Sequence, residues 1–345
     1  MSDSSGRHGK LPPAPTRRKL RVDMLLVLLV GLLAGILLLR YAALHPETAT
    51  IHAKIAQEPS NNEPIRHQAD SRRAAPFRFL MFNVQNYFVD TEEARSAYQQ
   101  TPKSEQGREA VAEVIASAQP QVVGVIEIGG PKALMDLQQR LEKRGLRYPY
   151  SKVVMRQGEA RALAVLSQYS IVCDASVADF SLHGGRTMMR GMLDVTIQTE
   201  DARQFRLLGV HLKSRFDDNA ESADELRRSE AYAVATRVRD ILKQQPDMSL
   251  LVFGDWNDSP ADASVQVMVK GISNDSSLKR LRPKDSRGEN WTLHYQSGHE
   301  YCLYDHMFVN KRLAERMNKA HACGIVDILP SAKASDHRAL WCELR

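Results

Sequence analysis

Acidic, amide and imidazole side chains recur at the ends of apolar segments in this sequence. The stretch 250–260, LLVFGDWNDSP, has four apolar residues followed by Gly254, which predicts a buried strand that stops there. Asp255 and Asn257 come next, and their i, i+2 spacing can direct a carboxylate and an amide into one small volume. Asn donates a hydrogen bond while Asp accepts a proton, so the pair suits orienting a water molecule beside a phosphate. The alternative is an ordinary capped turn, since both residue types are common in turns.

Polar residues of the same kinds occupy five other predicted strand ends. In chain order, with the pair above, they are Asn83, Glu127, His211, Asp255 with Asn257, Asp305, and Asp336 with His337. Each has an ordinary explanation when taken singly: Glu127 can cap a helix that starts near Pro131, and a lone His211 is more often structural. Lys213 and Ser214 follow His211, however, and both are donors that a phosphate accepts. Because acids and imidazoles are costly to bury unpaired, six such strand ends predict convergence on one another, on a metal or on solvent.

Motifs that contain these residues follow one another in a fixed order along the chain. They are N-x-x-N at Asn83 and Asn86, I-E at Glu127, H-L-K-S at 211–214, G-D-W-N-D at 254–258, D-H at Asp305 and His306, and S-D-H at 335–337. The series resembles the endonuclease/exonuclease/phosphatase superfamily, which has the deoxyribonuclease I-like fold, and the resemblance covers residues 77–345. Each motif alone is weak evidence, whereas their order is specific. The stretches FNVQNYF and HLKS look most like the secreted bacterial nuclease-like branch.

The resemblance implies a fold and a metal site. The fold class is α/β: two packed mixed β-sheets flanked by helices, a four-layer sandwich with its site at one end. Glu127 is implied to bind a divalent metal, usually Mg²⁺ with Mn²⁺ or Ca²⁺ as alternatives, and Asn83 and Asp336 are implied as further ligands. An oxygen-rich set with few imidazole ligands suits a hard cation that keeps several waters. Whether one or two metals bind stays open.

The resemblance also implies five catalytic residues. They are His211, Asp255, Asn257, Asp305 and His337. His337, oriented by Asp305, is expected to act as general base or phosphate clamp. Asp255 and Asn257 are expected to position the attacking water and a phosphate oxygen, and His211 to stabilise or protonate the leaving oxygen. Attack on a phosphodiester brings an anion to an anion, so the metal and the donors must neutralise the charge that develops. Whether Asp255 or the His–Asp pair takes the proton of the water stays open.

The charge distribution bears on the substrate. The net charge of the 345 residues is +6, and the first 22 residues contribute +5 of it, so the remainder is near neutral and has no strong field for gripping duplex nucleic acid. Arg156, Arg186 and Arg190 are candidates for substrate contact, and the charged run 227–230 in a predicted helix, 225–242, is interpreted as a solvated face.

The expected function is metal-dependent, nuclease-like hydrolysis of phosphodiester bonds. The substrate class stays open between nucleic acid and a phospholipid headgroup. A lipid phosphodiesterase or phosphomonoesterase of the sphingomyelin or phosphoinositide type is therefore the alternative, and a non-catalytic binding module is a further one. No protein partner is indicated by the sequence.

The N-terminal 76 residues predict a membrane anchor and a tether. Residues 24–39 carry no charge and the apolar run continues past them, close to the roughly 20 residues needed to span a bilayer. The segment 23–44 is therefore expected to be a transmembrane helix that follows a basic cytoplasmic tail, 1–22, and precedes a flexible polar linker, 45–76. The positive-inside rule then places a single-pass protein in the cytoplasmic (inner) membrane with its catalytic domain, 77–345, exported. A cleaved signal peptide is the alternative, although its apolar region is usually shorter.

Composition and cysteine content add two constraints. An apolar fraction of 43% and a charged fraction of 26% are typical of a globular protein with a core. The four cysteines, Cys173, Cys302, Cys323 and Cys342, include no C-x-x-C pair, which argues against a structural zinc site. One disulfide among the last three and buried free thiols are both open, because an exported domain would meet oxidising conditions.

Overall fold

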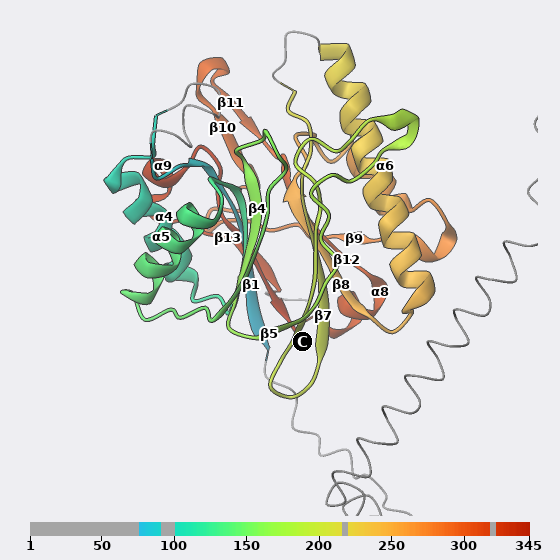
Figure 1. The fold of residues 1–345 in the computed structure, drawn as a ribbon, viewed down its shortest axis with the longest axis horizontal. Coiled ribbons are helices and arrows are strands. Elements are labelled where there is room, and N and C mark those ends of the chain that lie inside the picture. Colours follow the sequence, from blue (N-terminus) through green and yellow to red (C-terminus); the bar gives the residue numbers. More distant parts are fainter. Residues whose placement is uncertain (1–75, 91–100, 216–219, 318–321) are drawn as a thin grey trace, which may run out of the picture. The chain divides into compact units, whose positions relative to one another are not determined.

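Two six-stranded mixed β-sheets form the centre of the fold (Figure 1). The computed structural model describes residues 76–90, 101–215, 220–317 and 322–345. The first sheet contains, in spatial order, β13 (Cys323–Ile325), β14 (Leu340–Leu344), β1 (Phe77–Tyr87), β2 (Val122–Ile128), β4 (Ala162–Ser167) and β3 (Tyr150–Val154). The second contains β5 (Ser170–Asp174), β6 (Leu193–Gln198), β7 (Gln204–His211), β8 (Ser249–Asp255), β12 (Asp305–Val309) and β9 (Lys279–Arg280). A two-stranded ribbon of β10 (Leu293–Tyr295) and β11 (Glu300–Cys302) forms a third sheet.

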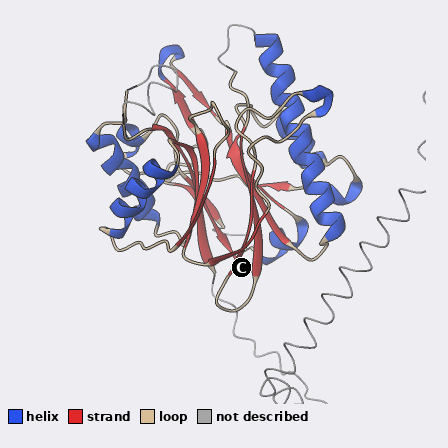
Figure 2. Cartoon of the chain, viewed as in Figure 1, coloured by secondary structure: helices blue, strands red, loops and turns tan. Residues whose placement is uncertain are grey.

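Helices cover the outer faces of both large sheets (Figure 2). On the side of the first sheet they are α4 (Glu105–Ala118), α5 (Pro131–Glu142) and α9 (Ser331–Ala334). On the side of the second sheet they are α6 (Ala220–Gln244) and α7 (Ala263–Lys270), whereas α8 (Lys311–Arg316) packs Leu313 against the cluster between the two sheets. The predicted four-layer α/β sandwich is therefore confirmed.

The central strands are buried on both faces, which is why they read as continuous apolar runs. In β1, Leu80 and Phe82 belong to the apolar cluster that the first sheet forms with α4 and α5. Phe79 and Met81 point the other way, into the cluster between the two sheets. A third cluster lies between the second sheet and the helices α6 and α7. The three clusters hold the four layers together.

One parallel pair lies at the centre of each sheet, β1 with β2 and β7 with β8. The carboxyl ends of paired parallel strands lie at the same edge of a sheet. β12 runs against β8, so that Asp305, its first residue, lies opposite Asp255, the last residue of β8. His211, the last residue of β7, lies opposite Asp255 on the other side. The strand pairing thus gathers ends that carry predicted site residues.

The N-terminal predictions fall outside the described residues. The basic tail, the transmembrane helix at 23–44 and all of the linker but its last residue lie there, so these stay predictions. Within the described ranges, no helix is both long and apolar enough to cross a membrane. β1 begins at Phe77, where the catalytic domain is predicted to begin. The four cysteines are free thiols.

Phe253 of β8 fills the space between the two sheets. Its ring lies 4.9 Å from that of Phe79 in β1, measured between centroids. Two glycines leave room for it: a Cβ at Gly124 of β2 would lie 2.3 Å from the Phe253 ring, and one at Gly209 of β7 would lie 2.7 Å away. Because protein interiors are close-packed, the two sheets can lie this close around Phe253 only if positions 124 and 209 carry no side chain.

We expect Gly124→Ala to lower the free energy of unfolding by about 1–3 kcal/mol, because the added methyl overpacks a core that cannot shift a strand. Phe253→Leu should be less destabilising in the Gly124→Ala background than in wild type, because it opens the space that the methyl needs. Urea unfolding measures both. Gly107→Ala in α4 is the control: its new Cβ would lie 3.2 Å from side-chain atoms of Lys103 and Ser104 and would meet no aromatic ring, so stability should change much less. Equal stability of Gly124→Ala and wild type would contradict this account of the core.

Candidate active site

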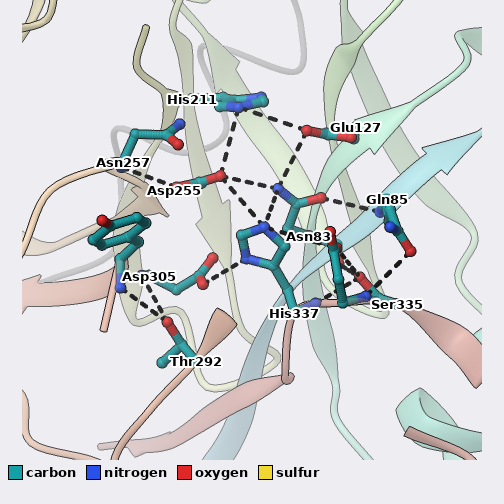
Figure 3. Close-up of polar contacts among 12 residues, drawn as sticks. Asn83, Gln85, Glu127, His211, Asp255, Asn257, Thr292, Asp305, Ser335 and His337 are labelled. Atoms are coloured by element: carbon teal, nitrogen blue, oxygen red, sulfur yellow. Dashed lines mark hydrogen bonds and ion pairs between the residues drawn. The ribbon is translucent and has the colours of Figure 1, made fainter. Parts of the chain in front are cut away.

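A cleft of about 680 Å³ opens where the carboxyl ends of β1, β2, β7 and β8 meet. Of the eight residues predicted for the site, six line it: Glu127, His211, Asp255, Asn257, Asp336 and His337. The other two, Asn83 and Asp305, lie directly behind and hydrogen-bond to residues that do (Figure 3). All eight therefore come together, although they are spread over more than 250 positions of the chain.

His337 is held by a buried carboxylate and faces a second one. Its Nδ1 lies 2.7 Å from Asp305 Oδ2, and its Nε2 lies 3.8 Å from Asp255 Oδ2. Thr292 Oγ1 accepts a hydrogen bond of 3.0 Å from the backbone N–H of Asp305, which fixes the start of β12. Burial lowers the pKa of His337, but the charge and hydrogen bond of Asp305 outweigh it and raise that pKa well above its ordinary value. His337 is therefore an imidazolium at neutral pH.

Asn83 bridges the carboxylates of the two sheets. Its Nδ2 donates to Asp255 Oδ2 at 3.0 Å and lies 3.5 Å from Glu127 Oε1. Its Oδ1 accepts from the backbone N–H of Gln85 at 3.0 Å. In this orientation the amide nitrogen faces the carboxylates, and binding a metal through the oxygen would require the amide to rotate. The geometry thus gives Asn83 a positioning role between Asp255 and Glu127.

Glu127 is an ionised carboxylate with several cationic neighbours. Its Oε2 accepts a hydrogen bond of 2.9 Å from the backbone N–H of Asn86 and lies 3.7 Å from Arg161 Nε. Burial raises the pKa of Glu127, but Arg161, His337 and Arg190 outweigh burial and bring that pKa below its ordinary value. The carboxylate therefore stays charged where it faces the cleft.

Left-handed backbone at non-glycine residues is concentrated at this site. Gln85, Asn86, Glu127 and Asn257 have φ values of 46°, 52°, 66° and 51°. Such conformations cost of order 1 kcal/mol or more and persist when the surrounding structure over-determines them. Here the pairing of β1 and β2 shifts register after Asn83, and the shift turns Glu127 and the 85–86 segment toward the cleft. The strain accompanies the positioning of site residues.

Two further carboxyl groups crowd around Glu127. Burial raises the pKa of Asp255 to about 7, with Asp305 and Glu127 adding to the effect and His337 opposing it. Burial also raises the pKa of Asp336, and the charge of Glu127 adds to that rise. Crowded carboxylates whose ionisation is resisted fit a divalent cation, because hard cations prefer several oxygen ligands and relieve the repulsion.

A second group of residues has the spacing of a metal site: one potential metal-ligand atom from each of Asp255, Asp305 and His337 lies within 4.8 Å of the other two. His337 is protonated there and hydrogen-bonded to Asp305, so its nitrogens have no lone pair to offer. We therefore assign this group to an ion-paired triad. The carboxylates of Glu127, Asp255 and Asp336 are the better candidates for a metal.

His211 is the opposite of His337 in charge. Its Nε2 lies 3.5 Å from Asp255 Oδ2 and 3.7 Å from Glu127 Oε1. Burial lowers the pKa of His211 well below its ordinary value, and the positive charges of Arg190 and Arg161 add to that effect. A neutral imidazole at pH 7 can stabilise an oxygen by hydrogen bonding, which is the first of the two roles expected for this residue.

Several residues of the cleft escaped the sequence reasoning. Arg161 and Tyr295 line it without belonging to any recognised motif. Glu230, taken for part of a solvated helix face, is fully buried and accepts hydrogen bonds from the backbone N–H groups of Met189 (2.8 Å) and Lys213 (2.7 Å). That interpretation of the charged run was wrong at Glu230 and also at Arg227, which is buried and lies 2.9 Å from Asp258, because α6 turns both residues inward.

The three arginines considered for substrate contact differ in position. Arg190 lines the cleft and donates to the backbone oxygen of Leu212 at 3.1 Å. Arg156 pairs with Asp179, and Arg186 binds residues of α6, and neither is among the residues that line the cleft. Of these three arginines, only Arg190 is thus placed to meet a substrate in the cleft.

The four-layer sandwich with this cleft at its strand ends is the architecture of deoxyribonuclease I-like phosphoric-ester hydrolases. The sequence matches the model of the Endonuclease/Exonuclease/phosphatase family over residues 82–337, well over half of the chain. The chain belongs to this family.

Solved structures share the fold. The human Nocturnin catalytic domain with bound sulfate anion is 17% identical at a TM-score of 0.53, with 78% of this chain and 94% of that chain covered. An endonuclease/exonuclease/phosphatase from Bacteroides vulgatus is 17% identical at 0.56, with 79% and 99% covered. Beta toxin from Staphylococcus aureus is 18% identical at 0.55, with 78% and 99% covered. Identities this low establish the fold alone, and no curated protein matches the sequence significantly.

We expect Asp305→Asn to return the His337 pKa toward or below 6.5, because the carboxylate is what outweighs burial. Without it His337 is neutral at pH 7, whereas in the wild type it stays protonated through neutral pH. NMR titration of the His337 ring in metal-free protein measures the change, with the distant His183 as internal control. A wild-type His337 that titrates near 6.5 would contradict the assigned triad.

Proposed function

We propose that this domain hydrolyses phosphodiester bonds in a nuclease-like reaction that depends on a divalent cation, Mg²⁺ in the first instance. One observation carries the proposal: a buried Asp305–His337 pair faces Asp255 across a cleft that also holds Glu127 and Asp336. Positive groups of Arg161, Arg190 and Lys213 line the same cleft, and an anionic substrate requires them.

Asp255 is proposed as the general base. A base works best when its pKa lies near the operating pH, and burial brings the pKa of Asp255 to about 7. The backbone N–H of Asn257 donates to Asp255 Oδ1 at 2.9 Å and fixes the carboxylate. His337 is protonated and so cannot accept the proton of a water molecule. Of the two bases left open by the sequence, Asp255 is therefore favoured.

His337 is proposed as the phosphate clamp. Its imidazolium presents Nε2 toward Asp255 and Asp336, where a phosphoryl oxygen would accept a charge-assisted hydrogen bond. Asp305 keeps the ring oriented and charged. Neutral His211, whose Nε2 lies 3.5 Å from the same Asp255 oxygen, would donate a further hydrogen bond to the phosphate. Together these donors would neutralise charge as it develops in an in-line displacement.

The metal is proposed to bind the carboxylates of Glu127 and Asp336, with Asp255 beside them. Mn²⁺ or Ca²⁺ could occupy an oxygen-rich site of this kind as well. When bound, the cation supplies positive charge to the phosphoryl oxygens. Asn83 would serve the site by bridging Asp255 and Glu127 through its amide nitrogen.

We propose in addition that residues 23–44 anchor the domain in the cytoplasmic membrane and that the domain is exported. The support is the uncharged apolar run and the basic residues before it. A reporter fused after Arg345 should be active outside the cytoplasm. Activity confined to the cytoplasm would refute the export.

We expect Asp255→Asn and His337→Ala each to lower kcat for bis(p-nitrophenyl) phosphate by roughly 10²–10⁴-fold, the usual contribution of a positioned acid–base group. Steady-state kinetics with Mg²⁺ measures the loss, and urea unfolding checks that the fold is kept. Asp174→Asn, which removes a carboxylate from the exposed Lys152 pair, is the matched control and should leave the rate unchanged. Near wild-type rates for both site variants would refute these roles.

We expect Glu127→Gln to weaken Mg²⁺ binding by at least about tenfold, because it removes a charged ligand from the cleft. Isothermal titration calorimetry of the full chain with Mg²⁺ measures the affinity. Glu113→Gln, on the exposed face of α4, is the control and should bind like the wild type. If Mg²⁺ binds both variants equally, the cation lies elsewhere.

A further inference from the structure

A second groove, of about 1130 Å³, lies between the edge strands of the two sheets, β9 and β13. It shares no lining residue with the catalytic cleft. Its cationic residues come from one short stretch, Lys279, Arg280, Arg282 and Lys284. Asp285 is the single acidic residue among the described residues that line it. The groove is therefore strongly basic in a domain that is otherwise near neutral.

Among the residues that the structure describes, none is a counter-ion to the four cations of the groove. No ion pair or side-chain hydrogen bond joins any of them to another described residue. Arginines close by are paired: Arg338 lies 2.8 Å and Arg287 3.4 Å from Asp285, and Arg312 lies 2.7 Å from Asp247. Because Asp285 is already engaged by two arginines, it does not neutralise the groove.

Arg280 is half-buried in this groove and lies near another cation. Burial lowers the pKa of Arg280, and the charge of Arg282 lowers it further. Holding a partly desolvated guanidinium beside a like charge costs free energy, and a bound anion would relieve that cost. The groove thus has the electrostatics of a site that receives negative charge from outside the described chain.

The shape of the groove favours a linear polyanion. Its floor includes the apolar side chains of Leu281, Met317 and Ile325, and its volume exceeds the roughly 300–1,000 Å³ of sites for single small molecules. Burial alternates along residues 280–285, so Arg280, Arg282 and Lys284 point to one side. In extended chain, residues two positions apart are separated by about 6.6 Å, which is the spacing expected between successive cations here. A row of spaced cations along a concave surface suits a strand of phosphates better than a flat lipid surface.

A smaller depression of about 200 Å³ adjoins the catalytic cleft. It shares Asp336 and His337 with the cleft. It shares no lining residue with the groove, but Asp327, which lines the depression, accepts a hydrogen bond from Ser286, which lines the groove.

Two aromatic side chains lie at this depression. Trp291 lines the depression and lies 4.8 Å from Tyr301, whose side chain is 61% exposed. An exposed aromatic ring such as that of Tyr301 is a usual element of sites for single-stranded nucleic acid, because a base can stack on it.

We propose that the groove between β9 and β13 binds the sugar-phosphate backbone of a single-stranded polynucleotide whose cleaved phosphate lies in the catalytic cleft. The strand would run from His337, past Trp291 and Tyr301, to Arg280 and Arg282. The proposal deepens the proposed phosphodiesterase function and rests on it for the cleavage, since it names DNA or RNA single strands as the substrate class.

Fluorescence anisotropy of the full chain with labelled oligothymidylates of 3 and 18 nucleotides, in EDTA and a nonionic detergent, tests the groove without turnover. The variant Arg280→Ser with Arg282→Ser should bind the 18-mer at least tenfold more weakly and leave the 3-mer unaffected. Its slope of log affinity against log salt should fall by about 1.4, since each contact to a single strand contributes about 0.7. The matched control, Arg147→Ser with Arg228→Ser, loses the same charge from exposed positions and should keep wild-type affinity.

Unchanged affinity of the groove variant for the 18-mer, or an equal loss in the matched control, would overturn the proposal. So would a groove variant that binds the 18-mer normally but loses binding to phosphatidylglycerol vesicles, because the groove would then serve a lipid surface. Hydrolysis of bis(p-nitrophenyl) phosphate by the wild type tests the catalytic function separately, so failure of one claim is distinguishable from failure of the other. Urea unfolding of both variants excludes a loss of fold as the cause.

Discussion

The hydrogen bond from Asn83 to Asp255 joins the two sheets at the point where the chemistry is proposed. Asn83 lies on β1 of the first sheet and Asp255 ends β8 of the second, and the 3.0 Å bond between them is buried. A buried carboxylate left without a partner is expensive, so this contact ties the position of one sheet to that of the other. The apolar packing around Phe253 sets the distance between the sheets, and the Asn83 amide sets their register at the site.

The same environment gives chemically identical groups different charges. His337 and His211 both lie within 4 Å of Asp255, yet one is protonated and the other neutral. The difference follows from their other neighbours, since Asp305 contacts only the first and Arg190 and Arg161 act on the second. Glu127 is likewise held ionised while the ionisation of Asp255 is resisted. The cleft therefore holds a proton donor, His337, and a proton acceptor, Asp255, side by side, and no change of conformation is needed to bring them together.

Much of this arrangement was predictable from the sequence, because strand ends are visible as the points where apolar runs stop. Parallel pairing places His211 beside Asp255 in one sheet and Asn83 beside the Glu127 strand in the other. The fold class came from the resemblance of the ordered motifs to a known family, which implied that the two edges meet. The orientation of Asn83 was not predictable, because it depends on a backbone N–H two residues away. Nor was the burial of Glu230, since a helix with charged residues on most faces gives no signal that one of them points inward.

The basic groove shows a further limit of sequence reasoning. Lys279, Arg280, Arg282 and Lys284 are plain in the sequence, but a charge run is ordinarily a solvated and neutralised surface. What distinguishes this one is that the nearest carboxylate, Asp285, points to Arg338, the residue next to the clamp His337. Pairing Asp285 with Arg338 supports the residue that follows His337 and at the same time engages the one carboxylate among the described residues that line the groove. The same ion pair therefore supports the residue next to the clamp and withholds a carboxylate from the groove, although one carboxylate would offset only one of its four cations.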